Sequence, residues 1–406
     1  MKYITRWIEK RIEDTLESHP VVILSGPRQV GKSTLLTASK TFAGWRAITL
    51  DDVDVLDQAK HDPKGLLWDE RPMIIDEVQR CPELLITVKH LVDASHRKRK
   101  FILSGSGNVS LRKEPRETLA GRAKYLHASG FAYRELAGLS PEGVLHHAWT
   151  GKTVVAAKAP ILQDIPHAVW RGSLPGVVLS RTQAIATDRL SGYIDTYLQR
   201  DIQDLVKIRH PENFRTMMSA LARATGRACA QEELAGLCGE SRPNVSRYLA
   251  LLEETQVLYA LRGYTVKNER AYKHAKYFWF DSGAACFLSG MHDSTGLEQP
   301  HVRGRYFENY VLHQIRAWGS LQTVAPTIGY WQSKTHDAEV DFVLSAPGKT
   351  LGIEVKSSKT LQFSDTKTLR LFMAAHPEVT QCLLVYAGNE IYPIATNIIA
   401  VPITAL

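Results

Sequence analysis

A glycine-rich stretch carries the clearest chemical signal in this sequence. Residues 26–33 read Gly-Pro-Arg-Gln-Val-Gly-Lys-Ser and match the pattern G-x-x-x-x-G-K-[ST] at every fixed position. Gly26 and Gly31 allow a tight backbone curve whose amide N–H groups can point at a phosphate. Lys32 would reach the β- and γ-phosphates of a nucleotide, and the Ser33 hydroxyl would bind Mg²⁺. The stretch therefore predicts a phosphate-binding loop that uses ATP and Mg²⁺.

The flanking residues supply the context that such a loop requires. Residues 21–24 are four consecutive apolar residues, three of them β-branched, and predict a buried strand. Residues 34–38 open a helix, whose positive N-terminal end would face the phosphates. The alternative is a glycine-rich turn that binds nothing. The residues expected to contact the nucleotide are Gly26, Pro27, Arg28, Gln29, Val30, Gly31, Lys32, Ser33 and Thr34.

A second motif closes another apolar strand with two acids. Residues 72–77 read Pro-Met-Ile-Ile-Asp-Glu. Asp76 would help hold the Mg²⁺ ion, and Glu77 would orient and polarise the attacking water. Two solvated acids at a strand end are the alternative, but their position downstream of the phosphate-binding loop favours the catalytic interpretation.

Two further polar positions could assist hydrolysis. Residues 101–104 predict a strand that runs into Gly-Ser-Gly-Asn, where Asn108 or Ser106 could sense the γ-phosphate or simply form a turn. Arg122 precedes another short strand. It could neutralise transition-state charge as an arginine finger, or form a salt bridge within its own domain.

A third group of charged residues lies near the C-terminus. Residues 339–344 and 351–356 predict two strands, and a hairpin between them would place Asp341 beside Glu354 and Lys356 on one face. With the Val355 carbonyl and a helical Glu308 nearby, these carboxylates could bind a divalent ion that activates a phosphodiester, while Lys356 stabilises charge or positions water. Acids that alternate on a solvent face are the alternative.

Residues 231–249 have the pattern of two short helices around a glycine-containing turn, with Ser241 as the N-cap of the second helix. Two strands at 258–261 and 276–280 would complete a winged helix. Its basic wing, which also includes Arg262 and Lys276, suits a phosphate backbone; a packing or switch module is the equally weighted alternative. The expected nucleic-acid contacts are Arg242, Asn244, Arg247, Lys267, Arg270 and Lys273.

Four regions are expected to position these residues. Five strands separated by helices predict a parallel α/β sheet over 1–135, preceded by an amphipathic helix at 4–16 that packs on it. Residues 136–210 are expected to form an irregular connector followed by a helical segment. A winged helix at 211–285 and a further α/β domain at 296–406 would complete the chain.

Composition limits the class of protein but does not identify a function. The chain has 406 residues, 44% of them hydrophobic, and a net charge of +8, which favours a polyanionic partner such as nucleic acid. Its five cysteines form no C-x-x-C pair, and neither a signal peptide nor a run of 18 apolar residues is present. We therefore expect a cytoplasmic protein that does not associate with membranes.

These motifs together resemble those of bacterial and archaeal AAA-type ATPases that carry an uncharacterised C-terminal region. The similarity rests on residues 26–33, 76–77, 119–122 and 193–202, while residues 301–406 resemble the PD-(D/E)XK nuclease fold through Asp341, Glu354 and Lys356. The resemblance implies an α/β P-loop NTPase domain, an all-α winged-helix module and a restriction-endonuclease-like α/β domain.

Two functions follow from this reading. In the first, ATP hydrolysis controls binding of nucleic acid, with DNA favoured, and Mg²⁺-dependent cleavage. In the second, an ATP-driven switch binds DNA or a protein without cutting it. A protein partner and oligomer formation both stay open.

Overall fold

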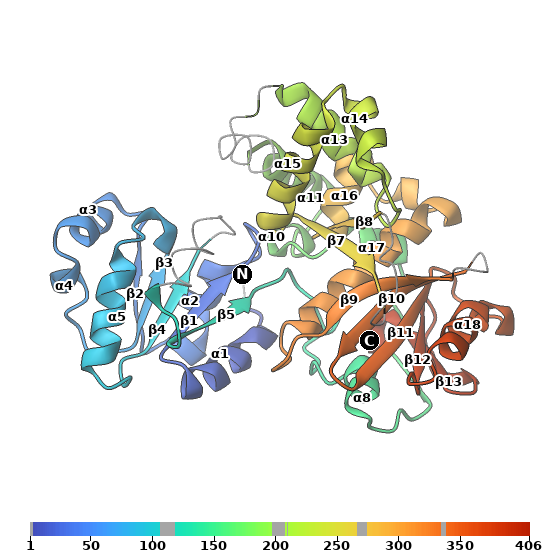
Figure 1. The fold of residues 1–406 in the computed structure, drawn as a ribbon, viewed down its shortest axis with the longest axis horizontal. Coiled ribbons are helices and arrows are strands. Elements are labelled where there is room, and N and C mark those ends of the chain that lie inside the picture. Colours follow the sequence, from blue (N-terminus) through green and yellow to red (C-terminus); the bar gives the residue numbers. More distant parts are fainter. Residues whose placement is uncertain (1–2, 106–117, 197–207, 209, 266–273, 334–337) are drawn as a thin grey trace. The chain divides into compact units, whose positions relative to one another are not determined.

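A computed structural model describes residues 3–105, 118–196, 208, 210–265, 274–333 and 338–406 (Figure 1). The chain divides into two compact units. The first consists of residues 1–131 with 254–256, and the second of residues 132–253 with 257–406. Ser106, Asn108, Lys267, Arg270 and Lys273 lie outside the described residues, as does most of the 193–202 segment.

A five-stranded parallel sheet forms the centre of the first unit, in the order β2-β3-β4-β1-β5. This confirms the parallel sheet expected from the sequence. Because all strands run the same way, the carboxyl ends of β3, β4 and β1 lie side by side at one edge, where ligands bind in such sheets. The strands are β1 (Val21–Ser25), β2 (Arg46–Thr49), β3 (Met73–Asp76), β4 (Phe101–Ser104) and β5 (Ala123–His127).

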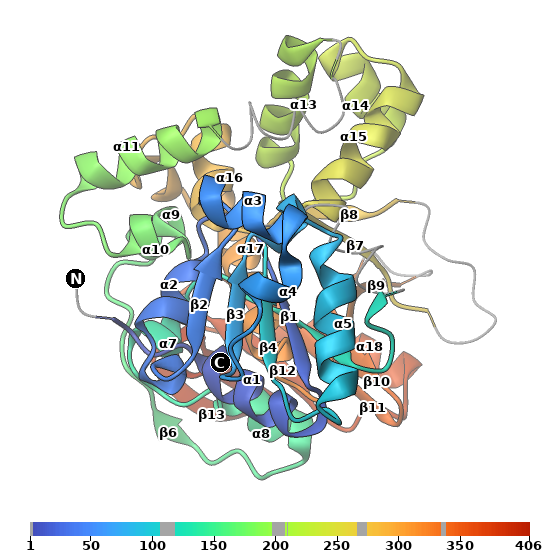
Figure 2. The same cartoon turned by 90° about the vertical axis from the view of Figure 1, so that its left-hand side faces the viewer.

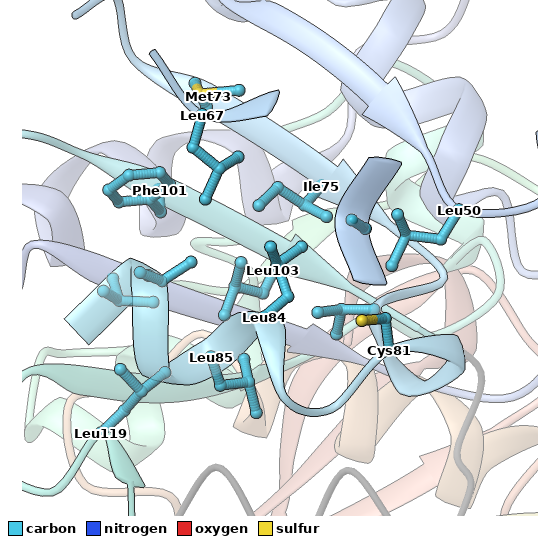
Figure 3. Packing of buried hydrophobic residues seen from close by; sticks show 14 of the residues in the cluster. Leu50, Leu67, Met73, Ile75, Cys81, Leu84, Leu85, Phe101, Leu103 and Leu119 are labelled. Carbon is cyan, nitrogen blue, oxygen red and sulfur yellow. The ribbon is translucent and has the colours of Figure 1, made fainter. Parts of the chain in front are cut away.

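Helices cover both faces of this sheet. Helix α5 packs its buried residues, among them Leu84 and Leu85, on alternate side chains of the strands such as Ile75 and Leu103 (Figure 3). Helix α1 contacts β1, and its buried Ile12 is outside that cluster, on the opposite face. The helices are α1 (Trp7–Ser18), α2 (Lys32–Ala38), α3 (Val53–His61), α4 (Pro63–Leu66) and α5 (Leu84–Ala94), with short 3₁₀ turns η1 (Lys40–Phe42) and η2 (Val78–Arg80).

The start of the second unit differs from the irregular connector expected from the sequence. Several short helices form there, and they bury large side chains such as Trp149 and Trp170. Elements of four to seven residues carry too few turns for a periodic pattern, so tertiary packing rather than local sequence defines them. The elements are α7 (Tyr133–Leu136), α8 (Val144–Thr150), β6 (Ala157–Lys158), α9 (Ile165–Arg171), α10 (Pro175–Val178) and the longer α11 (Gln183–Tyr193).

Three helices and a hairpin follow where the sequence placed the helix-turn-helix. Helix α15 begins with the backbone N–H of Asn244 donating to Ser241 Oγ at 3.4 Å, so Ser241 does cap this helix. The elements are α13 (Pro211–Arg223), α14 (Gln231–Cys238), α15 (Arg242–Glu254), and the antiparallel strands β7 (Leu258–Gly263) and β8 (Lys276–Trp279). Helices α16 (Ser282–Leu288) and α17 (Pro300–Gly319) come next, with the turn η4 (Thr295–Leu297) between them.

A nine-stranded mixed sheet ends the chain, in the order β6-β13-β14-β12-β11-β10-β9-β7-β8. Strand β7 pairs in parallel with β9 through Arg262 and Gly329, so the hairpin belongs to this sheet (Figure 2). The predicted domain boundaries inside residues 132–406 stay predictions. The remaining elements are β9 (Thr327–Gln332), β10 (Glu339–Ala346), β11 (Lys349–Lys356), η5 (Phe363–Thr366), α18 (Lys367–Ala375), β12 (Cys382–Tyr386), β13 (Glu390–Ala395), β14 (Ile398–Pro402) and η6 (Ile403–Ala405). Within the described ranges, we find no helix with the length and apolar character needed to span a bilayer.

Candidate functional site

The glycine-rich loop connects β1 to α2 and requires glycine at its first position. A Cβ atom on Gly26 would lie 2.2 Å from the carbonyl oxygen of Ala128, which is far too close for any side chain. Gly31 has φ 92° and ψ 24°, a left-handed conformation, and forms the N-cap of α2. The backbone therefore has the curve that the sequence pattern predicts, directly before the N-terminus of a helix.

Lys32 is folded back onto its own loop. Its Nζ donates to the carbonyl oxygens of Gly26 and Pro27, both at 2.9 Å, and only 7% of the residue is exposed. Burial lowers its pKa to about 8, although the charges of Glu77 and Asp76 oppose that shift. Ser33 follows at the start of α2 and is exposed, so its hydroxyl is accessible to a ligand.

The two acids after β3 lie close enough to Lys32 to act on its pKa. Asp76 ends the strand, and its Oδ1 accepts a hydrogen bond from the backbone N–H of Glu77 at 3.1 Å. Glu77 adopts a left-handed conformation with φ 54°, which is unusual for a residue with a side chain. Burial raises the pKa of Glu77, and its carboxylate accepts a hydrogen bond from Gln79. Lysine and both acids are thus brought together at the same sheet edge.

Strand β4 lies between the loop-bearing β1 and the acid-bearing β3, and it ends with a residue that the sequence analysis did not select. Ser104 is fully buried, pairs in register with Leu24, and its Oγ has no hydrogen-bond partner among the described residues. The predicted candidate Asn108 lies further along, outside the described residues. The sequence signal for Ser104 was its place at the strand end itself, two positions before Ser106 and four before Asn108.

Arg122 forms the salt bridge that was the second of its two predicted roles. Its Nε and Nη2 donate to the two carboxylate oxygens of Asp93 at 2.6 and 2.8 Å, and its Nη1 donates to the carbonyl oxygen of Ala120 at 2.9 Å. The guanidinium is therefore engaged within its own unit, as the salt-bridge interpretation expects, and the arginine-finger role stays a prediction.

In the second unit, the strands β10 and β11 form the expected hairpin. They are antiparallel, with Phe342 opposite Ile353, which sets Asp341 beside the end of β11. Asp341 Oδ2 accepts a hydrogen bond from the backbone N–H of Val355 at 2.7 Å. Lys356 Nζ donates to Glu354 Oε1 at the same distance. The three residues of the predicted motif therefore lie together on one side of the sheet.

Glu308 from helix α17 joins these carboxylates. Burial and the charge of Asp341 raise its pKa well above the usual range, and the same two causes raise the pKa of Glu354 to about 8. Among the described residues, Glu308 Oε1 is buried without a hydrogen-bond partner, whereas the Glu354 carboxylate is stabilised by Lys356 and Thr368. Clustered carboxylates repel each other and a cation relieves that repulsion, and carboxylate oxygens are the ligands that Mg²⁺ and Mn²⁺ prefer. In their present arrangement, however, no three acid, His or Cys side chains of the described chain are placed to ligate one.

Lys276 corrects one part of the wing prediction. The sequence analysis placed it among the basic residues available to a phosphate backbone, but it is only 3% exposed. Its Nζ pairs with Glu339 and lies 5.0 Å from the centre of the Tyr330 ring. Burial opposes its charge, yet Glu308, Glu339 and Asp341 outweigh that effect and raise its pKa. Lys276 is thus, after Lys356, a second cation of the carboxylate cluster. It comes from strand β8 of the hairpin, and the sequence did not predict this position.

The predicted nucleic-acid contacts that the structure describes have partners in α14, in α15 or in the turn between them. Arg242 forms an ion pair with Glu232 at 3.1 Å, and Asn244 Nδ2 donates to Glu240 at 2.8 Å. The guanidinium of Arg247 lies 5.3 Å from the ring centre of Tyr248. These contacts are near the surface and leave the nucleic-acid prediction open.

The fold and loop of the first unit are those of a P-loop NTPase. Residues 18–137 match the family model described as an AAA domain. Residues 162–295 and 303–406 match two other models, each described as a domain of unknown function (DUF8612 and DUF4143). The boundaries of the three matches enclose the loop, the helix-and-hairpin segment and the carboxylate cluster, respectively.

Similar proteins span almost the whole chain. An uncharacterized protein of Mycobacterium tuberculosis, Rv2008c, is 28% identical over 97% of this chain and 82% of its own length. An uncharacterized protein of Methanocaldococcus jannaschii, MJ1544, is 22% identical over 85% of this chain and 76% of its own.

Two solved structures are similar in part. The Walker-type ATPase of Pyrococcus abyssi has a TM-score of 0.44 at 16% identity, covering 69% of this chain and 94% of that one. The RuvB Holliday junction branch migration motor of Thermotoga maritima has a TM-score of 0.25 at 18% identity, covering 62% and 88%.

Proposed function

We propose that this protein binds and hydrolyses ATP at the edge of its parallel sheet, and that the nucleotide state controls the second unit. The observation that carries the proposal is the position of Lys32 inside the glycine loop, close enough to Asp76 and Glu77 for their charges to act on it. A cation that meets phosphate oxygens and two acids that serve a metal ion and a water molecule are what phosphoryl transfer to water requires.

Each residue has a distinct role in this proposal. Lys32 leaves the carbonyl oxygens of its loop and binds the β- and γ-phosphates. Ser33 and Asp76 would hold Mg²⁺, which neutralises charge on the phosphates when bound. Glu77 orients the attacking water and polarises it, and its raised pKa suits a group that accepts a proton.

Two substitutions separate binding from hydrolysis. Lys32→Ala should abolish detectable ATP binding and turnover, because the charge that meets the phosphates is lost. Glu77→Gln should keep the ATP dissociation constant within about threefold while turnover falls by about a hundredfold or more. Lys40→Ala, at an exposed lysine of the same unit, is the control and should change neither quantity. ATP hydrolysis by Lys32→Ala at the wild-type rate would contradict the proposal.

For the second unit we propose a divalent-ion site at Asp341, Glu354 and the Val355 carbonyl, with Glu308 nearby, that cleaves nucleic acid. The buried Glu308 Oε1, which has no hydrogen-bond partner among the described residues, and the clustering of Asp341 and Glu354 beside it favour this site. Lys356, bonded to Glu354, would stabilise charge or position water. The alternative is a switch that binds DNA or a protein without cutting, in which the two lysines alone neutralise the acids.

Incubation with DNA and with RNA decides between these functions. Cleavage that needs Mg²⁺ or Mn²⁺, and that Asp341→Asn abolishes, supports the nuclease. Binding without cleavage in every combination of ATP and metal favours the switch. Titrations at several salt concentrations should accompany the assay, since each phosphate contact contributes about 0.9 to the log–log salt slope on duplex DNA.

The winged-helix interpretation has its own test. Alanine at Lys267, Arg270 and Lys273 should weaken DNA binding and reduce that salt slope if the basic segment contacts phosphates. Alanine at Lys276 should not reduce it, because that lysine is buried. An unchanged slope in the triple variant would assign the segment to protein packing instead.

A further inference from the structure

Arg6 lies buried between the glycine loop and the segment that follows β5. It precedes helix α1 and is 5% exposed. Its Nη1 donates to the carbonyl oxygen of Val30 at 3.0 Å, inside the loop. Its Nη2 donates to the carbonyl oxygens of Ser129 at 2.7 Å and Gly130 at 3.3 Å. One guanidinium thus joins two segments that are almost a hundred residues apart in the sequence.

The chemistry of this contact is particular to arginine. A planar guanidinium presents its N–H donors in a rigid fork, so the two ends can serve carbonyl groups of different segments simultaneously. The ring of Phe131 lies against it, with its centre 4.5 Å from the guanidinium carbon. A lysine would keep the charge but present it as a single point, and could not hold both segments in the same geometry.

Glu9 fixes the position from which Arg6 reaches these carbonyls. Its Oε1 accepts hydrogen bonds from the backbone N–H of Arg6 at 2.6 Å and from the Tyr3 hydroxyl at 2.7 Å. Its Oε2 accepts from Ser39, and from Thr41 at 3.2 Å, just beyond the end of α2. The start of α1 is therefore anchored to the helix that follows the glycine loop.

A second contact joins the loop to the same segment. Gly26 packs so closely on Ala128 that only glycine fits, and the Ala128 N–H donates to the Ser25 carbonyl at 2.8 Å. The beginning of the loop thus contacts Ala128 directly, while its end reaches Ser129 and Gly130 through Arg6. Any movement of the loop backbone would therefore reach this segment at both points.

The chain continues from this segment into the second unit. Ala132 is the first residue of that unit, and the next backbone N–H, of Tyr133, donates to Gln314 Oε1 at 2.7 Å. Gln314 belongs to helix α17, which also carries Glu308. Residues 128–131 are therefore joined through the chain to a residue that is hydrogen-bonded to the helix carrying Glu308.

We infer that Arg6 is a positioning residue that couples the nucleotide state of the glycine loop to residues 128–131, and through them to the second unit. The inference rests on the proposed ATP binding but adds to it the route by which ATP acts. Arg6 itself needs no contact with the nucleotide.

Hydrogen–deuterium exchange of the full chain, with and without ATP and Mg²⁺, tests this route. In the wild type, ATP should change exchange both in the loop and in peptides that cover residues 127–137. In Arg6→Gln, the change in the loop should persist, with an ATP dissociation constant within about tenfold of wild type, whereas the change at 127–137 should shrink to the part carried by the remaining Gly26–Ala128 contact. Lys10→Gln, on the exposed side of the same helix, is the matched control and should respond like wild type.

Each outcome has a definite meaning. If ATP leaves 127–137 unchanged in the wild type, or changes it equally in Arg6→Gln, the coupling is absent. If the wild type does not bind ATP, the proposed function fails instead. If thermal denaturation shows that Arg6→Gln is not folded, Arg6→Lys is used in its place, because lysine keeps the positive charge but lacks the forked arrangement of N–H donors. A full wild-type response in that variant would overturn the inference.

Discussion

Lys32 Nζ lies 2.9 Å from the carbonyl oxygen of Gly26, the residue that opens its own loop. The lysine thus bridges the two ends of the glycine motif, at a depth where burial lowers its pKa from 10.5 to about 8. A bound polyphosphate would strongly favour the charged lysine and raise the pKa again. Nucleotide binding and protonation of Lys32 are therefore linked.

This linkage predicts that ATP affinity falls as the pH rises above about 8, because the lysine must then take up a proton on binding. At pH 9 we expect close to one proton bound per ATP, and at pH 7 almost none from this group. Calorimetry in two buffers of different ionisation enthalpy measures this number. Folding without nucleotide should depend on pH in the opposite direction. The free energy of unfolding should rise with pH between about 8 and 10.5, because in that range Lys32 binds a proton in the unfolded chain but not in the folded one. Proton uptake near zero at pH 9 would show that Lys32 does not meet the phosphates.

The first unit was largely predictable from the sequence because its signals are local. Runs of apolar residues marked the strands, and each chemical motif sat at a strand end, where a parallel sheet brings them together. The short helices around Trp149 and Trp170 were not predictable in this way, since they exist through contacts with distant residues.

A matched pair of glycines tests how closely the loop is fitted. In Gly26→Ala the new methyl group would meet the Ala128 carbonyl at 2.2 Å, so we expect the free energy of unfolding to fall by about 1–3 kcal/mol and ATP binding to be lost. Gly44→Ala has no neighbouring atom within 4 Å and should change stability by less than about 0.5 kcal/mol. Chemical denaturation and ATP titration of both variants provide the measurement. Equal stability of the two would mean that the loop can move away from Ala128.

Arg122 offers a test between a structural and a catalytic role. Its guanidinium is paired with both oxygens of Asp93, so Arg122→Ala should leave ATP turnover within about threefold of wild type. Asp93→Ala should have the same small effect, because it removes the other half of the same contact. An arginine finger would instead cost about a thousandfold or more in turnover. A loss of that size in Arg122→Ala alone would return the residue to the active site.

The buried cations Arg6 and Lys276 show what a sequence pattern cannot supply. Arg6 looks like a polar position of an amphipathic helix, and Lys276 like one more charge in a basic hairpin. Both are buried because partners arrive from distant parts of the chain: loop carbonyls for Arg6, and Glu339 with Glu308 for Lys276. Glu339 did carry a usable signal, since it lies two residues before Asp341 and thus on the same side of β10.

Lys276 also leads to a prediction for the carboxylate cluster. It already occupies this cluster as a cation, so a divalent ion must compete with it for the acids. In a Lys32→Ala background, which silences the nucleotide site, Lys276→Met should bind Mn²⁺ more tightly than the parent, and Asp341→Asn about tenfold more weakly. Lys359→Met, at an exposed lysine beyond β11, is the control and should match the parent.

Calorimetric titration with Mn²⁺ gives all four affinities and separates the two explanations of this cluster. Clustered carboxylates repel each other, and either a metal ion or the lysines can relieve that repulsion. Tighter binding in Lys276→Met would show that lysine and metal ion use the same charges. Equal affinity in the parent and Asp341→Asn would leave Asp341 as a structural partner of the Val355 N–H and of the nearby lysines. The second unit would then bind its partner without metal-dependent cleavage.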